Sequence, residues 1–77
     1  MKTQLKKGIK SAAASKGMNF TTVTEGTGRS IGNFSMILGN GNPRMDFLSE
    51  VGESMGMDLC FVDPQTNNKY EIFKINQ

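Results

Sequence analysis

The chain has 77 residues, a formal net charge of +2 and no histidine. A core of this size is marginal without help from a partner, so we predict a single domain over residues 1–77 that gains support by oligomerising. A single cysteine, Cys60, excludes an internal disulfide and is expected to be a small buried hydrophobe. With one cysteine and no histidine, we expect no protein-built zinc site and no cofactor.

Apolar residues never form a long run in this chain. The longest run, Leu59 to Val62, is far too short to span a membrane. The basic residues near the start, Lys2, Lys6 and Lys7, precede no apolar segment of the signal-peptide type. We therefore expect a cytoplasmic protein with no membrane partner.

Charge is divided unevenly along the chain. Residues 1–44 carry seven basic side chains and one acid, a net charge of +6, whereas residues 45–77 carry two bases and six acids, a net charge of −4. A basic half beside an acidic half indicates a polyanionic partner on one side. A solvated lysine face on an ordinary helix explains the same charges, so the division alone favours nucleic acid only slightly.

A first helix is predicted over residues 2–16. Thr3 is placed to cap its start, and Gly17 suits the position just past its end. Apolar residues recur within it at helical spacing and predict one buried stripe, made of Leu5, Ile9, Ala12 and Ala13.

A second helix is predicted to begin at Asn19 and to end at Gly28. Asn19 is a good N-cap, and Met18 and Val23 have the spacing of a hydrophobic staple. The run from residue 21 to 24 is rich in β-branched residues, and propensity alone favours a strand there. The staple and the glycine favour a helix, which is our interpretation.

Ser30 is predicted to cap a third helix that ends by Leu38, before a loop over residues 39–42. Helical periodicity divides this helix into two faces. The buried face is expected to hold Phe34, Ile37 and Leu38, and the opposite face Ile31, Gly32, Ser35 and Met36.

A fourth helix is predicted to start with Asn42 as its cap and Pro43 at its first position, and to end at Gly56. Asp46 would lie near the positive end of its dipole. Helical spacing predicts a buried stripe with Phe47 at its edge, formed by Met45, Leu48, Val51 and Met55.

The periodicity then changes to that of strands. Residues 58–63 and 69–75 are rich in strand formers and flank a short loop, which predicts an antiparallel hairpin. Strand alternation puts Tyr70 and Ile72 on one face and Phe73 and Ile75 on the other. A hairpin lying on helices can bury only one face, so a second copy of the chain is expected to cover the other. The predicted fold is mainly α with a C-terminal β-hairpin: a helical bundle over residues 1–56 and a dimerisation hairpin over residues 57–77.

The order of these elements resembles the lambda-repressor/Cro-like (XRE) helix-turn-helix family over residues 5–61. The resemblance rests first on Leu5-Lys6 and Ile9 in the first helix, and on Lys16-Gly17-Met18 leading into Val23. It continues with Thr27-Gly28 at the turn, Ser30 as cap, Phe34-Ser35, Ile37-Leu38, Asn42-Pro43, and the later series Met45, Leu48, Val51, Met55-Gly56 and Leu59. It implies a Cro/repressor-like bundle of about four short helices plus two antiparallel strands. It also implies a small phage-type regulator whose third helix enters the major groove of double-stranded DNA, and a strand extension of the kind some phage members use to dimerise.

Three residues depart from the pattern of that family. Thr24 stands where alanine is usual, at the closest contact between the second and third helices. Arg29 stands where an aliphatic residue is usual, and Phe47 where a polar residue is more common. Phe47 is interpreted either as an exposed aromatic on a partner surface or as a residue packed against the hairpin.

The resemblance implies a set of DNA-contacting residues. The third helix and its flanks would meet bases through Ser30, Ile31, Gly32, Asn33, Ser35, Met36 and Asn42, while phosphates would be held by Lys6, Lys7, Lys10 and Arg29. Only Asn33 and Asn42 could pair with adenine in bidentate fashion, and each also has a structural interpretation. Ile31 and Met36 could touch thymine methyl groups.

The dimer interface is predicted at Phe47, Tyr70, Ile72, Phe73 and Ile75. The leading hypothesis is a homodimeric DNA-binding transcriptional regulator of phage or bacterial type. The alternative is a protein-interaction module, an inhibitor or adaptor, on a degenerate helix-turn-helix fold that no longer reads DNA. An enzyme is not expected, because no serine or cysteine has an obvious base and Gly26-Thr27-Gly28 lacks the remainder of a phosphate-binding loop.

Overall fold

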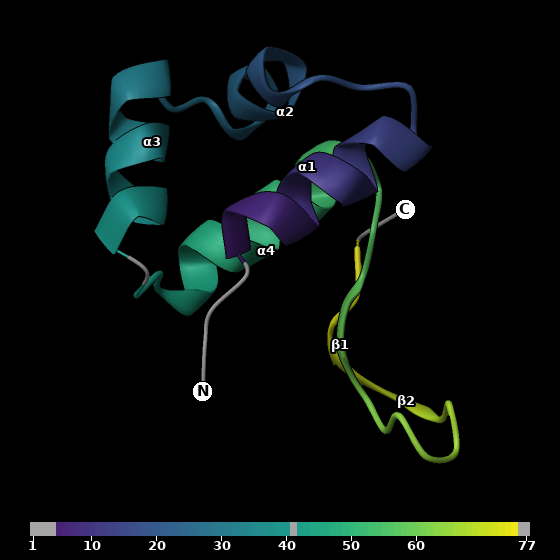
Figure 1. Ribbon diagram of the computed structural model, residues 1–77. Coiled ribbons are helices and arrows are strands. Elements are labelled where there is room, and N and C mark those ends of the chain that lie inside the picture. Colours follow the sequence, from purple (N-terminus) through teal and green to yellow (C-terminus); the bar gives the residue numbers. More distant parts are fainter. Residues whose placement is uncertain (1–4, 41, 76–77) are drawn as a thin grey trace.

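Four helices are followed by a two-stranded antiparallel sheet in the computed structural model, which describes residues 5–40 and 42–75 (Figure 1). The predicted fold class, mainly helical with a C-terminal hairpin, is confirmed. The elements are α1 (Leu5–Ser15), α2 (Phe20–Thr27), α3 (Ile31–Asn40), α4 (Met45–Met55), β1 (Leu59–Val62) and β2 (Lys69–Phe73).

Local signals in the sequence set the boundary between α1 and α2. Gly17 adopts a φ of +69°, and the Met18 N–H donates to the Ala13 carbonyl at 2.9 Å, which closes the end of α1. Asn19 then caps α2, because its Oδ1 accepts the Thr22 N–H at 2.8 Å. Both glycine and cap act as predicted, whereas the predicted Thr3 cap lies outside the described residues.

The boundary between α3 and α4 differs from the prediction. α3 continues through Gly39 to Asn40, two residues past Leu38, because no proline interrupts its hydrogen-bond ladder there. Asn42 and Pro43 precede α4 rather than open it, and Arg44 occupies the N-cap without a side-chain cap bond. The acceptor comes instead from inside the first turn, where Asp46 Oδ1 accepts the N–H of the next residue at 2.9 Å.

A single core lies among the four helices. Phe34 is at its centre, fully buried, and its ring meets the rings of Phe20 and Phe47 edge to face, with centroids 5.1 Å apart in both pairs. The buried hydrophobic residues are Ile9, Ala13, Val23, Phe34, Leu38, Phe47, Val51 and Met55. All eight come from the helices and none from the hairpin.

The buried face of α4 is rotated from the predicted stripe. Phe47, expected at the edge, is only 1% exposed, whereas Met45, expected inside, is 53% exposed. The ring of Phe34 provides the reason, because it takes Phe47 as its packing partner and so turns Met45 outward. Phe47 therefore belongs to the core of the single chain, and both predicted interpretations of it, a partner surface and a contact with the hairpin, are wrong.

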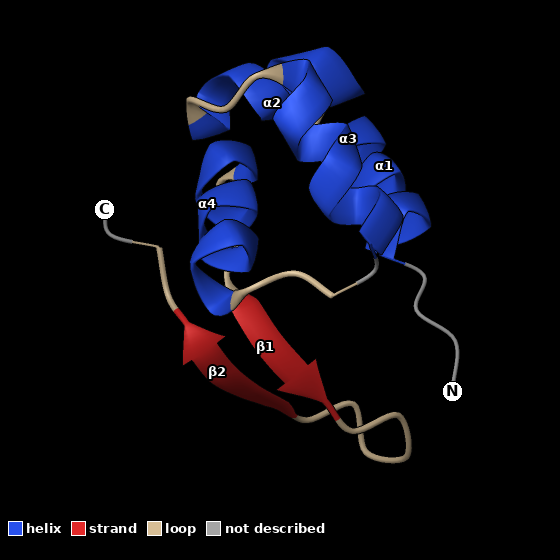
Figure 2. Ribbon diagram, turned by 90° about the vertical axis from the view of Figure 1, so that its left-hand side faces the viewer, coloured by secondary structure: helices blue, strands red, loops and turns tan. Residues whose placement is uncertain are grey.

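The chain leaves α4 at its C-terminal end, and the hairpin that follows extends away from the helical bundle (Figure 2). Its register pairs Phe61 with Tyr70 and Leu59 with Phe73, with a shift between Leu59 and Cys60 that leaves Ile72 without a partner. This bulge inverts the alternation expected for β2. Tyr70 and Phe73 therefore share a face with Leu59 and Phe61, and the predicted division of Tyr70 from Phe73 is wrong.

Candidate functional site

A tight turn at Gly28 joins α2 to α3. Gly28 adopts a φ of +77°, and its N–H donates to the Glu25 carbonyl at 3.1 Å. Ser30 then caps α3 as predicted, accepting the Asn33 N–H on its Oγ at 3.2 Å. The turn directs α3 steeply away from α2, so that α3 forms one side of the molecule, remote from the hairpin (Figure 1).

Close packing against α4 holds α2 in place. The Oγ of Ser54 donates to the Val23 carbonyl at 2.8 Å, across the interface between these helices. A Cβ at Gly26 would collide with the Ser54 side chain, so glycine is needed there for the helices to approach. On the same helix Thr24 is 2% exposed, and its hydroxyl donates to the Phe20 carbonyl at 2.9 Å, one turn back along α2.

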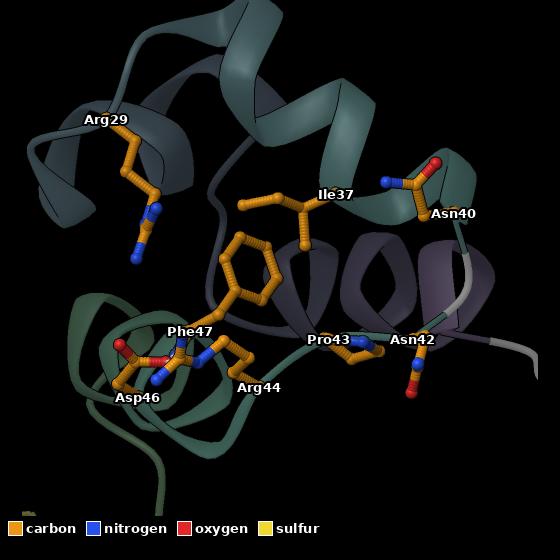
Figure 3. A pocket seen from close by; sticks show the side chains of 8 residues that line it. All are labelled: Arg29, Ile37, Asn40, Asn42, Pro43, Arg44, Asp46 and Phe47. Carbon is orange, nitrogen blue, oxygen red and sulfur yellow. Dashed lines mark hydrogen bonds and ion pairs between the residues drawn. The ribbon is translucent and has the colours of Figure 1, made fainter.

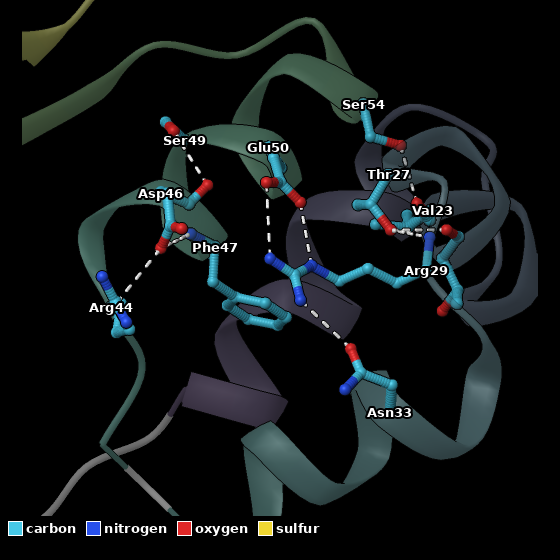
Figure 4. Close-up of polar contacts among 11 residues, drawn as sticks. Val23, Thr27, Arg29, Asn33, Arg44, Asp46, Phe47, Ser49, Glu50 and Ser54 are labelled. Atoms are coloured by element: carbon cyan, nitrogen blue, oxygen red, sulfur yellow. Dashed lines mark hydrogen bonds and ion pairs between the residues drawn. The ribbon is translucent and has the colours of Figure 1, made fainter.

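Arg29 connects the turn to α4 and α3 (Figure 4). Its Nε donates to Glu50 Oε1 at 2.8 Å, its Nη1 donates to Asn33 Oδ1 at 3.1 Å, and its guanidinium lies 5.3 Å from the centroid of the Phe47 ring. The hydrogen bond to Glu50 raises the pKa of the Arg29 guanidinium above its ordinary value, against the opposing effect of burial. We call Arg29, Asn33, Phe47 and Glu50 the Arg29 cluster.

The Arg29 cluster changes the roles predicted for two site residues. Arg29 was predicted to hold a phosphate, but its side chain is 26% exposed and already paired with Glu50. Asn33 was predicted as one of two bidentate readers of adenine, but it is half buried and its Oδ1 already accepts from Arg29. A bidentate contact with adenine uses both amide atoms of Asn33, so the bond from Arg29, which takes one of the two lone pairs of Oδ1, restricts that predicted role.

The outer face of α3 carries no charged side chain. Ile31 is 51% exposed and Met36 is 59% exposed, while Gly32 and Ser35 are also exposed, all as predicted from the helical spacing. No other side chain lies within 4 Å of the place where a Cβ would stand on Gly32 or Gly39. The face is therefore a bare strip of backbone flanked by two apolar side chains.

A hollow of about 290 Å³ lies at the C-terminal end of α3, between that helix and the start of α4 (Figure 3). Asn42, predicted to contact DNA, is exposed on its rim. The side chain of Arg44 is 89% exposed and comes no closer to Asp46 than 3.8 Å. An amide and a largely free guanidinium thus stand next to the end of α3.

The three predicted phosphate-binding lysines lie on α1, and all are exposed. Lys10 extends toward the start of α2, with its Nζ 5.6 Å from the centroid of the Phe20 ring. Lys6 lies one turn earlier on the same flank, whereas Lys7 faces farther away from the bundle. The structure therefore brings Lys6 and Lys10, more than Lys7, to the side of the molecule on which α2 lies.

The predicted dimer residues divide into two groups. Tyr70 and Ile72 are 58% and 43% exposed, and Phe61, which was not predicted, is 70% exposed. Phe73 and Ile75 are half buried, and the Ile75 N–H donates to Asp58 Oδ1 at 3.0 Å. The exposed apolar surface of the hairpin, formed by Phe61 and Tyr70 and continued by Leu59 and Phe73, is hereafter the hairpin face.

Sequence reasoning missed the Arg29 cluster, although both of its unusual members had been noticed. Arg29 and Phe47 each depart from the family pattern, and the structure shows that they pack on one another.

In residues 5–40 and 42–75, no three histidine, cysteine or acidic side chains are grouped closely enough to hold a metal ion. No helix in these two segments combines the length and apolar character needed to cross a membrane.

The chain matches no family model, and no curated protein or solved structure matches it. The resemblance to the lambda-repressor/Cro-like family therefore stays a prediction that rests on the residues quoted for it.

Proposed function

We propose that this chain is a small cytoplasmic DNA-binding transcriptional regulator that inserts α3 into the major groove. The observation that carries the proposal is the outer face of α3, which is free of charge and of packing partners within the described chain while its inner face is anchored in the core through Phe34 and Leu38. A helix presented after a tight turn in this way is the arrangement by which helix-turn-helix proteins read DNA.

Charge supports a polyanion on this side of the molecule. The first 44 residues carry a net charge of +6, and the carboxylate of Glu50, which reaches the turn from α4, is paired with Arg29. Lys6 and Lys10 on α1 and Arg44 after α3 are exposed and would meet phosphates on either side of the groove.

The hairpin supports a homodimer. The described part of the chain pairs β1 and β2 only with each other, so each strand keeps one edge of unpaired backbone groups. A second copy that paired through β2 and covered the hairpin face would extend the sheet around a two-fold axis. The two α3 helices would then need to lie roughly 34 Å apart to meet successive half-sites on one side of the duplex.

Salt dependence of binding tests the proposal. For mixed-sequence duplex DNA, we expect the logarithm of affinity to fall linearly with the logarithm of salt concentration, by about 0.9 for each phosphate contact. Lys6→Ala and Lys10→Ala should each make the slope shallower by about one unit. Lys74→Ala, an exposed lysine beyond β2, is the matched control and should leave the slope unchanged. No measurable binding at low salt would refute the proposal.

The second candidate is a protein-interaction module, such as an inhibitor or adaptor, and one observation favours it. The outer face of α3 offers no arginine, lysine or glutamine to a base, and Asn33 is engaged by Arg29. Exposed Ile31 and Met36 suit an apolar protein surface as well as they suit a groove. The salt titration distinguishes the two, since a module of this kind would bind no duplex.

A further inference from the structure

We propose that α3 recognises the 5-methyl groups of thymine, so that the preferred ligand is a thymine-containing duplex read by apolar contact. This inference rests on the proposed function and specifies the ligand of the same site.

Polar readout by this face is limited to short side chains. Residues 31–40 contain no charged side chain, and the bidentate capacity of Asn33 is reduced by its bond to Arg29 at 3.1 Å. Ser35 offers a hydroxyl, which does not distinguish reliably between bases. The exposed amide of Asn40 lies at the last position of the helix. Over the rest of the outer face few hydrogen bonds can distinguish one base from another, so apolar contact is the main discrimination that this face offers.

The outer face of α3 does offer two exposed apolar side-chain ends, which we call the tips. Ile31 and Met36 are more than half exposed and stand on opposite flanks of the outer face. In the major groove the thymine methyl is the apolar group that marks one base, and aliphatic side chains recognise it by excluding water. Two such tips could each cover one methyl group.

The backbone between the tips can approach the base edges closely. Gly32 and Gly39 lie along the middle of the outer face, two turns apart, and both have open space where a Cβ would be. Neither glycine is required by a contact within the chain, in contrast to Gly26, whose Cβ would strike Ser54. An alanine at either position would favour the helix, so the bare backbone is consistent with an external surface that comes near.

Replacing thymine by uracil removes the methyl group and nothing else. The probes are four duplexes of equal length: alternating A·T, the same duplex with uracil, alternating G·C, and the same duplex with 5-methylcytosine. We expect the A·T duplex to bind more tightly than its uracil form by about fourfold for each methyl group covered. The 5-methylcytosine duplex should bind more tightly than the unmethylated one, since its methyl group occupies the same place in the groove.

Variants connect the preference to the two tips. Ile31→Ala and Met36→Ala should each move the thymine-to-uracil affinity ratio toward one, whereas Met45→Ala, which removes an equally exposed methionine from α4, should leave it unchanged. Because all three side chains are exposed, thermal unfolding should be little altered, and circular dichroism checks this. Equal affinity for thymine and uracil duplexes would overturn the inference and leave the proposed function standing. Failure to bind any of the four duplexes would overturn both.

Discussion

Aromatic side chains differ in exposure between the helical bundle and the hairpin. In the bundle Phe34 and Phe47 are 0% and 1% exposed, whereas in the hairpin Phe61 and Tyr70 are 70% and 58% exposed. The bundle closes its core without a contribution from the strands, since every fully buried hydrophobic residue is helical. The comparison indicates that the helices enclose the core, whereas the hairpin leaves apolar surface exposed.

The connection between the two regions is narrow. β1 begins three residues after Gly56 ends α4, and the Met57 N–H donates to the Gly52 carbonyl at 2.8 Å to shape that exit. A Cβ at Gly52 would press on the Met57 carbonyl oxygen, so this position requires glycine. Beyond this point only the base of the hairpin, around Leu59, is near the helices, and its outer part extends away from them (Figure 2).

The largest expected effect is a loss of stability in the helical bundle. Phe34→Ala removes a ring that packs edge to face on two others, and we expect it to lower the free energy of unfolding by about 3–5 kcal/mol. Phe61→Ala, the matched change on the hairpin, should cost far less, because that ring is already in water. Urea unfolding at submicromolar protein, where association contributes least, measures both. Equal losses would contradict the division into two regions.

The second expected effect tests what the hairpin presents. We expect Tyr70→Lys to weaken self-association about 30-fold or more, because it places a charge on the hairpin face. Val62→Lys is the control: Val62 is 49% exposed but lies on the opposite face, since it follows Phe61 along the strand. Sedimentation at micromolar concentration should show dimer for the unaltered chain and for Val62→Lys, and monomer for Tyr70→Lys.

Two results would contradict the proposed dimer. A clean monomer for the unaltered chain at micromolar concentration would leave the hairpin face without its proposed partner. Equal weakening by both lysine variants would mean that charge on either face disturbs the hairpin itself. Thermal unfolding of the helices at low concentration should be similar in all three proteins, since none of the changed residues belongs to the core.

Short-range signals made much of the fold predictable from the sequence. Asn19 caps a helix by bonding a residue three positions away, and Gly28 and Gly56 end helices through their own positive φ. Each of these signals acts within one turn of the chain, so it can be read without knowing the tertiary structure. The exposed residues Ile31 and Met36 of the candidate site were also predictable, because the period of a helix alone separates its faces.

Long-range contacts account for what the sequence did not predict. Arg29 and Glu50 are 21 positions apart, and nothing near either residue indicates the other. Because Arg29 also bonds Asn33, a residue predicted to read bases turned out to be held from within the fold. The bulge at Ile72 is a similar case, since it depends on how β2 meets β1 and not on the alternation within β2.

The smallest expected effect lies inside the bundle, at Thr24. This residue is as buried as the core aromatics, yet we expect Thr24→Ala to change the free energy of unfolding by less than about 1 kcal/mol. Its hydroxyl donates to the Phe20 carbonyl, which as a helical carbonyl also has a backbone partner, so the loss of the hydroxyl leaves no buried group unsatisfied. Alanine also has the higher helix propensity, which offsets the lost contact.

Thr24→Val separates the two contributions, because valine keeps the branched shape of threonine and replaces its hydroxyl with a methyl group. If the hydroxyl matters little, as the bond within its own helix suggests, both variants should unfold close to the unaltered chain in urea. A loss of more than about 2 kcal/mol in both would mean that the hydroxyl holds α2 against its neighbours. A loss in Thr24→Ala alone would instead assign the effect to packing, because the methyl group that alanine lacks would then be filling space at the contact between helices.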